Sequence, residues 1–342
     1  MRLVALDLFR FCAALAVVLY HYTARGVDGG FQQLAQWTQF GYLGVPLFFM
    51  ISGFVIANSA DRRTATEFLI SRVARLYPAF WIGLIFTTLV VFCLGGKVIS
   101  VSQFFANATM LNDYLGIANV DGVYWTLQAE IKFYACIFLL LLIGAFNRYQ
   151  VWLPIWVVAT LLYLSIGQPS MMGWFISPGY SPYFISGACF YLLRSQERSL
   201  VVVVSLVVSF AMCTYQATQQ LSGFVPVVTI AGQWWAAIIV ILFHLLFALL
   251  ATDHLSIKPR NIYLILGGIT YPLYLIHNRA GKLIIDSLVN YIPEWFAVLI
   301  TTLGMLLLAF VIYKYFEPSG SLGLKKLLQK FLLFEKRSEM TR

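Results

Sequence analysis

Two ionisable side chains in the first apolar stretch, Arg10 and His21, are of types that bind anions and transfer protons. With Asp7 they interrupt an otherwise apolar run over residues 3–22. Ionisable residues inside a membrane span are costly, and they usually line a bundle interior or a water-filled cavity. On one helix, Arg10 and His21 would lie within roughly 20° of the same face and ~16 Å apart along the axis. We therefore expect a stripe with a cation at one level and an imidazole at another, and Asp7 close enough to pair with Arg10.

A second cationic group is the pair Arg72 and Arg75, which comes just before Pro78. A spacing of three residues places both guanidinium groups on one helical face, where they would suit phosphate groups. The excess of cations on the inner side of membrane proteins explains the same pair without any ligand. The spacing alone leaves both interpretations open.

The segment 125–134 carries a carboxylate, Glu130, among aromatic and apolar residues. Counting depth along the helices places Glu130 at about the level of His21. A carboxylate there would hold a neutral imidazole in one tautomer or accept hydrogen bonds from a hydroxyl-rich substrate. The alternative is an ion pair with Lys132 or another interfacial cation. Trp125 and Tyr134, from the same segment, are candidates for contacts with a substrate.

Among the four histidines, His277 is the second candidate for the site, because its span is expected to end on the same side as His21. A histidine at a helix end is more often an interfacial or structural residue than a catalyst. We expect His277 to bind substrate, and an interfacial or structural role is the alternative. His244 lacks a polar stripe around it and His254 falls in a loop, so both are weaker candidates.

The composition indicates what must position these side chains. Hydrophobic residues make up 61% of the chain and charged residues 11%, and the mean hydropathy is +0.82. These values predict an all-α, polytopic membrane helix bundle rather than a soluble enzyme. The five cysteines fall in apolar runs without a CxxC spacing, so we interpret them as packing residues and expect no metal. A cleaved signal peptide is not expected, because Arg10 interrupts the apolar region.

Apolar runs of about 20 residues predict about ten transmembrane helices. The expected spans are 4–24, 37–58, 76–96, 124–146, 150–168, 175–194, 200–217, 229–251, 262–284 and 294–315. Glycine and proline interrupt two of them, 37–58 and 175–194. Such breaks are tolerated where the backbone is buried or lines a cavity, and close helix packing through small residues is the other explanation.

The distribution of cations predicts the orientation. With the N-terminus in the cytoplasm, alternating spans place about 17 Lys and Arg residues inside and about four outside. We therefore expect a multi-pass protein of the inner (cytoplasmic) membrane with both termini in the cytoplasm. The same bias accounts for the net charge of +9 without a nucleic-acid partner. Residues 1–317 are expected to form the membrane domain, and residues 318–342 a basic amphipathic tail on the inner leaflet.

Five segments in this order resemble the acyltransferase-3 family of integral membrane acyltransferases, which O-acetylate cell-surface and secreted glycans. The resemblance covers nearly the whole chain, from Leu6 to about Tyr315. The segments are 6–10 with His21, 44–54, 68–78, the run 125–134 around Glu130, and 271–277.

This resemblance implies a ten-helix bundle that uses cytoplasmic acetyl-CoA, or a similar acyl-CoA, as donor. It carries over Arg10, His21, Arg72 and Arg75 as functional residues, and Glu130 matches the family's acidic position. A carbohydrate acceptor is implied, such as a surface polysaccharide, an exopolysaccharide or a lipid-linked sugar. Some members carry a C-terminal esterase-like domain; none follows the last expected span here, so the chain is expected to act on its acceptor directly.

Topology and resemblance together predict a mechanism. Acyl-CoA held by Arg72 and Arg75 extends its pantetheine arm past Arg10 and presents the thioester near His21. Neutral His21 acts as general base on an acceptor hydroxyl, and Arg10 binds donor phosphate or stabilises developing charge. An acetyl-histidine intermediate is the variant of this mechanism.

Other interpretations stay open. Asn112, Asp113 and Tyr114 are weaker candidates for holding a sugar, because loop packing explains them as well. A transporter or flippase also needs buried charges and broken helices, although the paired repeats of many transporters are not evident. A non-catalytic membrane partner or sensor is the third class.

Overall fold

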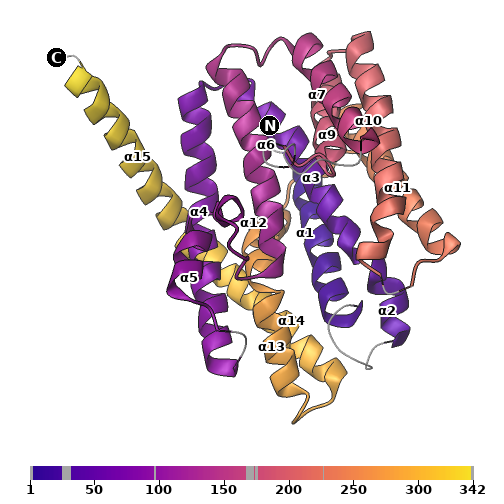
Figure 1. Ribbon diagram of the computed structural model, residues 1–342, viewed down its shortest axis with the longest axis vertical. Coiled ribbons are helices and arrows are strands. Elements are labelled where there is room, and N and C mark those ends of the chain that lie inside the picture. Colours follow the sequence, from indigo (N-terminus) through magenta and orange to yellow (C-terminus); the bar gives the residue numbers. More distant parts are fainter. Residues whose placement is uncertain are drawn as a thin grey trace.

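The structure is a computed structural model that describes residues 3–24, 32–95, 98–166, 173, 176–225 and 227–339. Within these ranges all regular secondary structure is helical, which confirms the predicted all-α class (Figure 1). The helices are α1 (Val4–Leu19), α2 (Gln32–Thr38), α3 (Gly44–Ala60), α4 (Ala65–Leu94), α5 (Val101–Ala108), α6 (Trp125–Leu142), α7 (Tyr149–Ser165), α9 (Ser181–Arg194), α10 (Leu200–Gln219), α11 (Ile230–Ala251), α12 (Asn261–Ile276), α13 (Arg279–Leu288), α14 (Glu294–Val311) and α15 (Glu317–Glu339).

Each of the ten expected spans contains a helix. In the described part of the chain, seven helical segments are long and apolar enough to cross a membrane, and α7 and α12 are shorter apolar helices. The seven are Val4–Ala24, Leu34–Ala60, Ala65–Leu94, Gly122–Leu142, Leu200–Gly223, Ile230–Ala251 and Glu294–Phe331. The chain is therefore a multi-pass membrane protein built as a helical bundle.

Helix breaks change the bounds of two expected spans. In the range 175–194, helix α9 begins only at Ser181, with Pro182 in its first turn, where a missing backbone N–H costs little. In the range 262–284, α12 ends at Ile276 and a separate helix, α13, begins at Arg279. Hydropathy alone does not reveal this second break, because both helices have apolar faces.

The central helices α3 and α9 pack backbone to backbone through glycine. A side chain on Gly53 would collide with the carbonyl oxygen of Phe184, and one on Gly187 with that of Met50. A side chain on Gly41, just before α3, would likewise collide with the backbone of α1. Close helix packing is therefore what these glycines provide.

We expect the substitution Gly187→Val to lower the free energy of unfolding by ~3 kcal/mol or more, because the new side chain meets backbone that cannot move aside. Thermal or chemical unfolding in detergent micelles measures this effect. The matched control is Gly304→Val in α14, where an added Cβ meets nothing within 4 Å. Equal stability losses in the two variants would contradict the proposed close packing.

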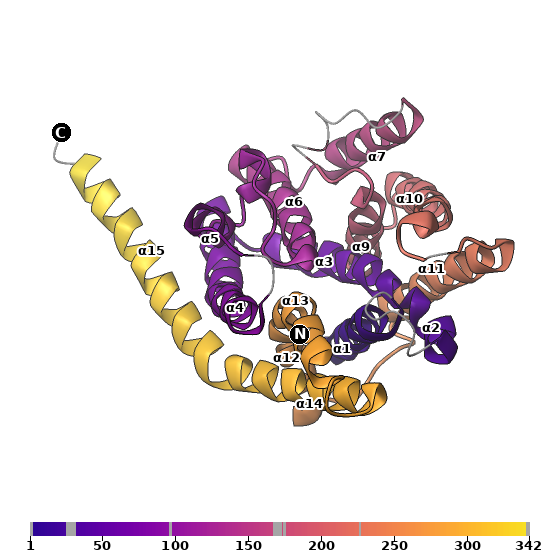
Figure 2. The ribbon, with the colours of Figure 1, turned by 60° about the horizontal axis from the view of Figure 1, so that its bottom comes forward.

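The last helix leaves the bundle after an initial contact. A π-helical turn over Ile312–Phe316 joins α14 to α15. Near the start of α15, the Ser321 hydroxyl donates to the carbonyl oxygen of Ala74 at 2.7 Å. Beyond this contact α15 projects away from the other helices (Figure 2). The residues expected to form a separate tail are thus helical, and their first turns pack on α4.

The segment between α4 and α6 folds back along the bundle instead of lying wholly at its end. The indole of Trp81 donates to the carbonyl oxygen of Ala108 at 2.9 Å, and the Tyr77 hydroxyl to that of Thr109 at 2.7 Å. Tyr77 and Trp81 lie in the middle of the 30-residue helix α4. Helix α5 and the loop after it therefore run beside the middle of α4 (Figures 1 and 2). This re-entrant segment, residues 101–121, was not anticipated from hydropathy.

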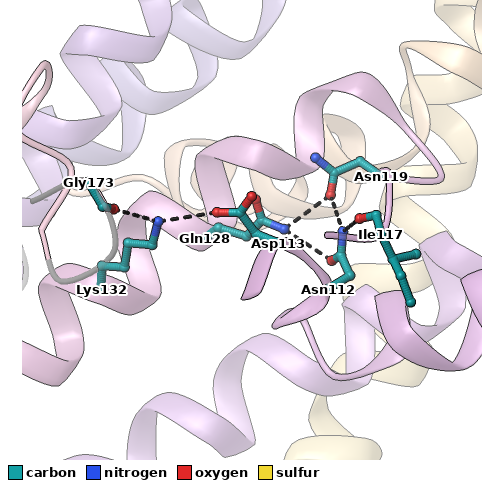
Figure 3. A network of polar contacts seen from close by, with 7 residues as sticks. All are labelled: Asn112, Asp113, Ile117, Asn119, Gln128, Lys132 and Gly173. Atoms are coloured by element: carbon teal, nitrogen blue, oxygen red, sulfur yellow. Dashed lines mark hydrogen bonds and ion pairs between the residues drawn. The ribbon is translucent and has the colours of Figure 1, made fainter. Parts of the chain in front are cut away.

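Amide side chains satisfy the backbone of the re-entrant segment (Figure 3). Asn112 Nδ2 donates to the carbonyl oxygen of Ile117 at 2.8 Å and to Asn119 Oδ1 at 2.9 Å. From α6, Gln128 Nε2 donates to Asn112 Oδ1 at 3.0 Å and to Asn119 Oδ1 at 3.1 Å. Irregular backbone at membrane depth is tolerated only when it is buried and hydrogen-bonded in this way.

An ion pair fastens the same segment to α6. Lys132 Nζ lies 3.3 Å from Asp113 Oδ2 and donates to the carbonyl oxygen of Gly173 at 2.9 Å (Figure 3). The loop-packing interpretation of Asn112 and Asp113 is therefore the one that the geometry supports.

Removing the Gln128 amide, as in Gln128→Met, is expected to lower the free energy of unfolding by ~1–3 kcal/mol, because buried amide oxygens of the segment lose their donor. Unfolding in detergent again provides the measurement. Gln219→Met, at an exposed position of α10, is the control and should change stability little. A Gln128 variant as stable as the control would refute this account of the segment.

Candidate active site

The paired arginines lie on the same face of α4, well inside the helix. A capping box starts α4 early: Glu67 N donates to Thr64 Oγ1 at 3.3 Å, and Thr64 N donates to Glu67 Oε2 at 3.1 Å. The helix thus begins at Ala65 rather than at residue 76 as expected. Pro78 is inside it rather than at its entry.

Helices α1, α4 and α6 bring five predicted site residues to one cavity of about 100 Å³. We call it the arginine cavity, and the five residues are Arg10, Arg72, Arg75, Glu130 and Tyr134. Three guanidinium groups face a single carboxylate there. The balance of charge in this cavity favours an anionic ligand.

The three guanidinium groups are held differently. Arg72 donates from Nη2 to Ser59 Oγ at 3.4 Å, and its guanidinium carbon lies 6.0 Å from the Tyr134 ring centre. Arg10 and Arg75 form no hydrogen bond with another described residue, so their donors are available to a ligand. Within the described residues, no ion pair joins Asp7 to Arg10; the Asp7 side chain lies against Gly267.

Glu130 is bound within the arginine cavity and does not contact His21. It accepts hydrogen bonds from Ser52 Oγ at 2.6 Å and from the Tyr134 hydroxyl, which approaches the same oxygen. Two expectations about this carboxylate are therefore wrong: it does not orient His21, and its partner is not Lys132, which pairs with Asp113.

His21 opens onto a second cavity, of about 420 Å³, which we call the histidine cavity. Its lining includes Tyr20, Trp125, Asn278 and Lys282. Val45 and Tyr274 line both this cavity and the arginine cavity. The two cavities are therefore neighbours that share a wall.

A change of helix type separates Arg10 from His21 in the first span. Regular α1 ends at Leu19, and a π-helical turn over Tyr20–Ala24 carries His21. Such turns alter the register and are frequent at functional sites. Arg10 and His21 consequently open to adjacent cavities rather than to one continuous stripe.

His277, not Glu130, is the partner of His21. His21 Nδ1 and His277 Nε2 lie 2.9 Å apart, although 256 residues separate them in sequence. His277 Nδ1 lies 2.9 Å from the carbonyl oxygen of Tyr274, and the His277 residue is fully buried. The Tyr22 hydroxyl donates to the carbonyl oxygen of His277 at 2.7 Å, which ties the two chain segments together.

Several residues of this region escaped the sequence reasoning, notably Ser52, Asp121 and Asn278. Ser52 lies within the resembling segment 44–54, which was the one signal for it. Asp121 and Asn278 carry no periodic or motif signal, because they act only through a contact between distant segments. His244, a weaker candidate from the sequence, contacts the carbonyl oxygen of Val240 and the hydroxyl of Ser186.

Metal chemistry was not expected. Among the described residues, no group of three or more His, Cys, Asp or Glu side chains could hold a metal ion.

Comparison with known proteins yields one extensive match. The family model described as "Acyltransferase domain" matches residues 3–314. Nodulation protein 10 of Rhizobium leguminosarum bv. viciae is 28% identical over 119 residues, which cover 29% of this chain and 32% of that protein. Acyltransferase MdmB of Streptomyces mycarofaciens is 31% identical over 145 residues, which cover 39% of this chain and 38% of that protein. This chain thus matches less than two fifths of either relative's length. No solved structure matches.

Proposed function

Because this chain belongs to the acyltransferase family whose model matches residues 3–314, we propose that it transfers an acyl group to a hydroxyl of a carbohydrate acceptor. The donor in this proposal is cytoplasmic acetyl-CoA or a similar acyl-CoA. The observation that carries the proposal is the pair of neighbouring cavities, one cationic and one holding an imidazole, that share Val45 and Tyr274.

The arginine cavity is the donor site of the proposal. Guanidinium groups bind phosphate through charge-assisted hydrogen bonds, and coenzyme A carries several phosphates. We place the nucleotide at the mouth of this cavity, beside Arg72 and Arg75. The narrow pantetheine arm then passes Arg10 toward Val45 and Tyr274. In this proposal the protein lies in the inner membrane and the mouth of the arginine cavity faces the cytoplasm, in line with the predicted excess of cations on the cytoplasmic side.

The histidine cavity is the acceptor site. Aromatic rings, including those of Tyr42, Trp125 and Phe224, form much of its lining. Such rings offer apolar faces to the C–H faces of a sugar, while Asn278 and Lys282 supply polar contacts to its hydroxyls. We assign Trp125 to substrate binding on this basis, and Tyr134, in the other cavity, to contacts with the donor.

The chemical step is a direct acyl transfer at the shared wall. His21 removes the proton of an acceptor hydroxyl, and the oxygen attacks the thioester carbonyl. The carbon–sulfur bond then breaks, and the coenzyme A thiolate leaves and takes up a proton. Arg10 stabilises the negative charge that develops on the donor side, while Glu130 holds Ser52 and Tyr134 at the donor site.

The test is acyl-CoA binding and acyl transfer by the purified protein reconstituted in liposomes, with labelled acetyl-CoA supplied on one side. Labelled sugar appearing on the other side supports the proposal. A folded protein that binds no acyl-CoA would overturn it, and would favour a transporter or flippase of glycans. Incubation with donor alone, followed by mass spectrometry, detects an acyl-histidine if transfer proceeds through that variant.

A further inference from the structure

We infer that His277 and Asp121 form a positioning relay that holds His21 as the Nδ1–H tautomer, with the lone pair on Nε2. The tautomer follows from hydrogen-bond geometry alone, whereas its value for catalysis rests on the proposed function. Neither His277 nor Asp121 is assigned to the chemical step, because each acts through His21.

The relay starts at a backbone carbonyl. The carbonyl oxygen of Tyr274, 2.9 Å from His277 Nδ1, can only accept a hydrogen bond, so Nδ1 of His277 must carry a hydrogen. Burial with no exposed surface disfavours a charged ring, and a neutral His277 then has its lone pair on Nε2.

That lone pair sets the state of the next ring. His277 Nε2 lies 2.9 Å from His21 Nδ1, so His21 Nδ1 must be the donor in this hydrogen bond. In a neutral His21, the remaining nitrogen, Nε2, therefore carries the lone pair. This is the nitrogen that does not donate to His277, and a general base accepts its proton through such a lone pair.

Asp121 fixes the place where His277 sits. Its side chain is fully buried, and Oδ1 accepts from Asn278 Nδ2 at 2.6 Å while Oδ2 accepts from the backbone N–H of Arg279 at 2.7 Å. Arg279 is the first residue of α13, so the carboxylate caps that helix from another segment of the chain. The break between α12 and α13, which contains His277, is thereby attached to the segment that precedes α6.

A second contact makes the attachment reciprocal. The Arg279 side chain donates from Nη1 to the carbonyl oxygen of Val120 at 2.7 Å, and Asp121 Oδ1 also accepts from Val123 N at 3.1 Å. Both sides of the carboxylate are thus engaged. This arrangement explains why a buried acidic residue lies so near the imidazole pair without bonding to either ring.

The first test reads the tautomer directly and needs no acyl transfer. With only four histidines in the chain, ¹⁵N-histidine NMR of the full-length protein in detergent can be assigned by single His→Gln variants. The relay requires a protonated Nδ1 and an unprotonated Nε2 on His21, and a mixture of tautomers on His21 in His277→Phe. An Nε2–H tautomer or a doubly protonated ring on wild-type His21 would overturn the inference.

The second test measures the consequence for turnover. We expect His277→Phe to lower kcat by ~10²-fold and Asp121→Asn by ~10-fold, since a misoriented base loses part of its contribution. His277→Gln should recover part of the loss, because its amide oxygen can accept from His21 Nδ1. The KM for acyl-CoA should stay unchanged in all three variants. General destabilisation of the protein would change the KM as well.

The control is His254→Gln, at an exposed position between α11 and α12, which should alter neither the NMR signals of His21 nor kcat. A kcat loss in His277→Phe no larger than in this control would refute the relay. If the wild type shows the tautomer but transfers no acyl group, the proposed function fails and the relay stands.

Discussion

Replacing His21 with glutamine is expected to lower kcat for acyl transfer by ~10³-fold, because removing a general base costs ~10²–10⁴-fold. Acyl-CoA binding should be unchanged, since His21 lines the histidine cavity and the donor groups line the arginine cavity. Single-turnover transfer and equilibrium binding of labelled acyl-CoA, both on the same reconstituted samples, separate the two effects.

The exposed His254 again supplies the matched control, as His254→Gln. A His21→Gln enzyme with full kcat would remove His21 from the chemical step. A variant that loses binding and turnover together would instead place His21 in the donor site. Either result would require a different base, and the shared wall at Tyr274 is where it would have to be sought.

Removing both paired guanidinium groups, as Arg72→Gln with Arg75→Gln, is expected to weaken acyl-CoA binding by ~10²–10⁴-fold. Hydrogen bonds to charged groups contribute ~1.5–3 kcal/mol each, and this variant removes at least two. Titration of the purified protein with acyl-CoA measures the effect. The double lysine variant should recover only part of the affinity, because an ammonium group keeps the charge but not the planar fork.

The control for charge alone is Lys325→Gln with Lys326→Gln, which removes two cations from α15, the helix that leaves the bundle. It should bind acyl-CoA nearly as tightly as wild type. If the control loses as much affinity as the arginine variant, binding reflects the general positive field rather than the arginine cavity. If neither variant loses affinity, the donor does not bind at these arginines.

The multi-pass helical bundle follows from composition because apolar length is a local property of the sequence. A run of about 20 apolar residues must cross the bilayer as a helix, whatever its neighbours are. Membership in the acyltransferase family was equally accessible, since its segments keep their order along the chain and the family model matches residues 3–314. The candidate residues Arg10, Arg72, Arg75 and Glu130 came from the same local signals, and they do converge on one cavity.

The re-entrant segment shows where this local reasoning stops. Residues 101–121 are polar enough to suggest a loop outside the membrane. Asn112 and Gln128 nevertheless form hydrogen bonds with each other and with the loop. These bonds allow the loop to lie beside the middle of α4. Whether a polar side chain faces water or a buried carbonyl depends on which group it bonds to. A hydropathy profile does not identify that group.

The sequence by itself determined the membrane class, the helical bundle and the family, and it named most of the charged candidate residues. Only the tertiary structure decided which partner each of them has. In the structure, His21 pairs with His277 rather than with Glu130. A π-helical turn separates His21 from Arg10. Pairings across 256 residues of sequence depend on helix breaks and packing angles, which arise from contacts among all the helices and leave no trace in local hydrophobic periodicity.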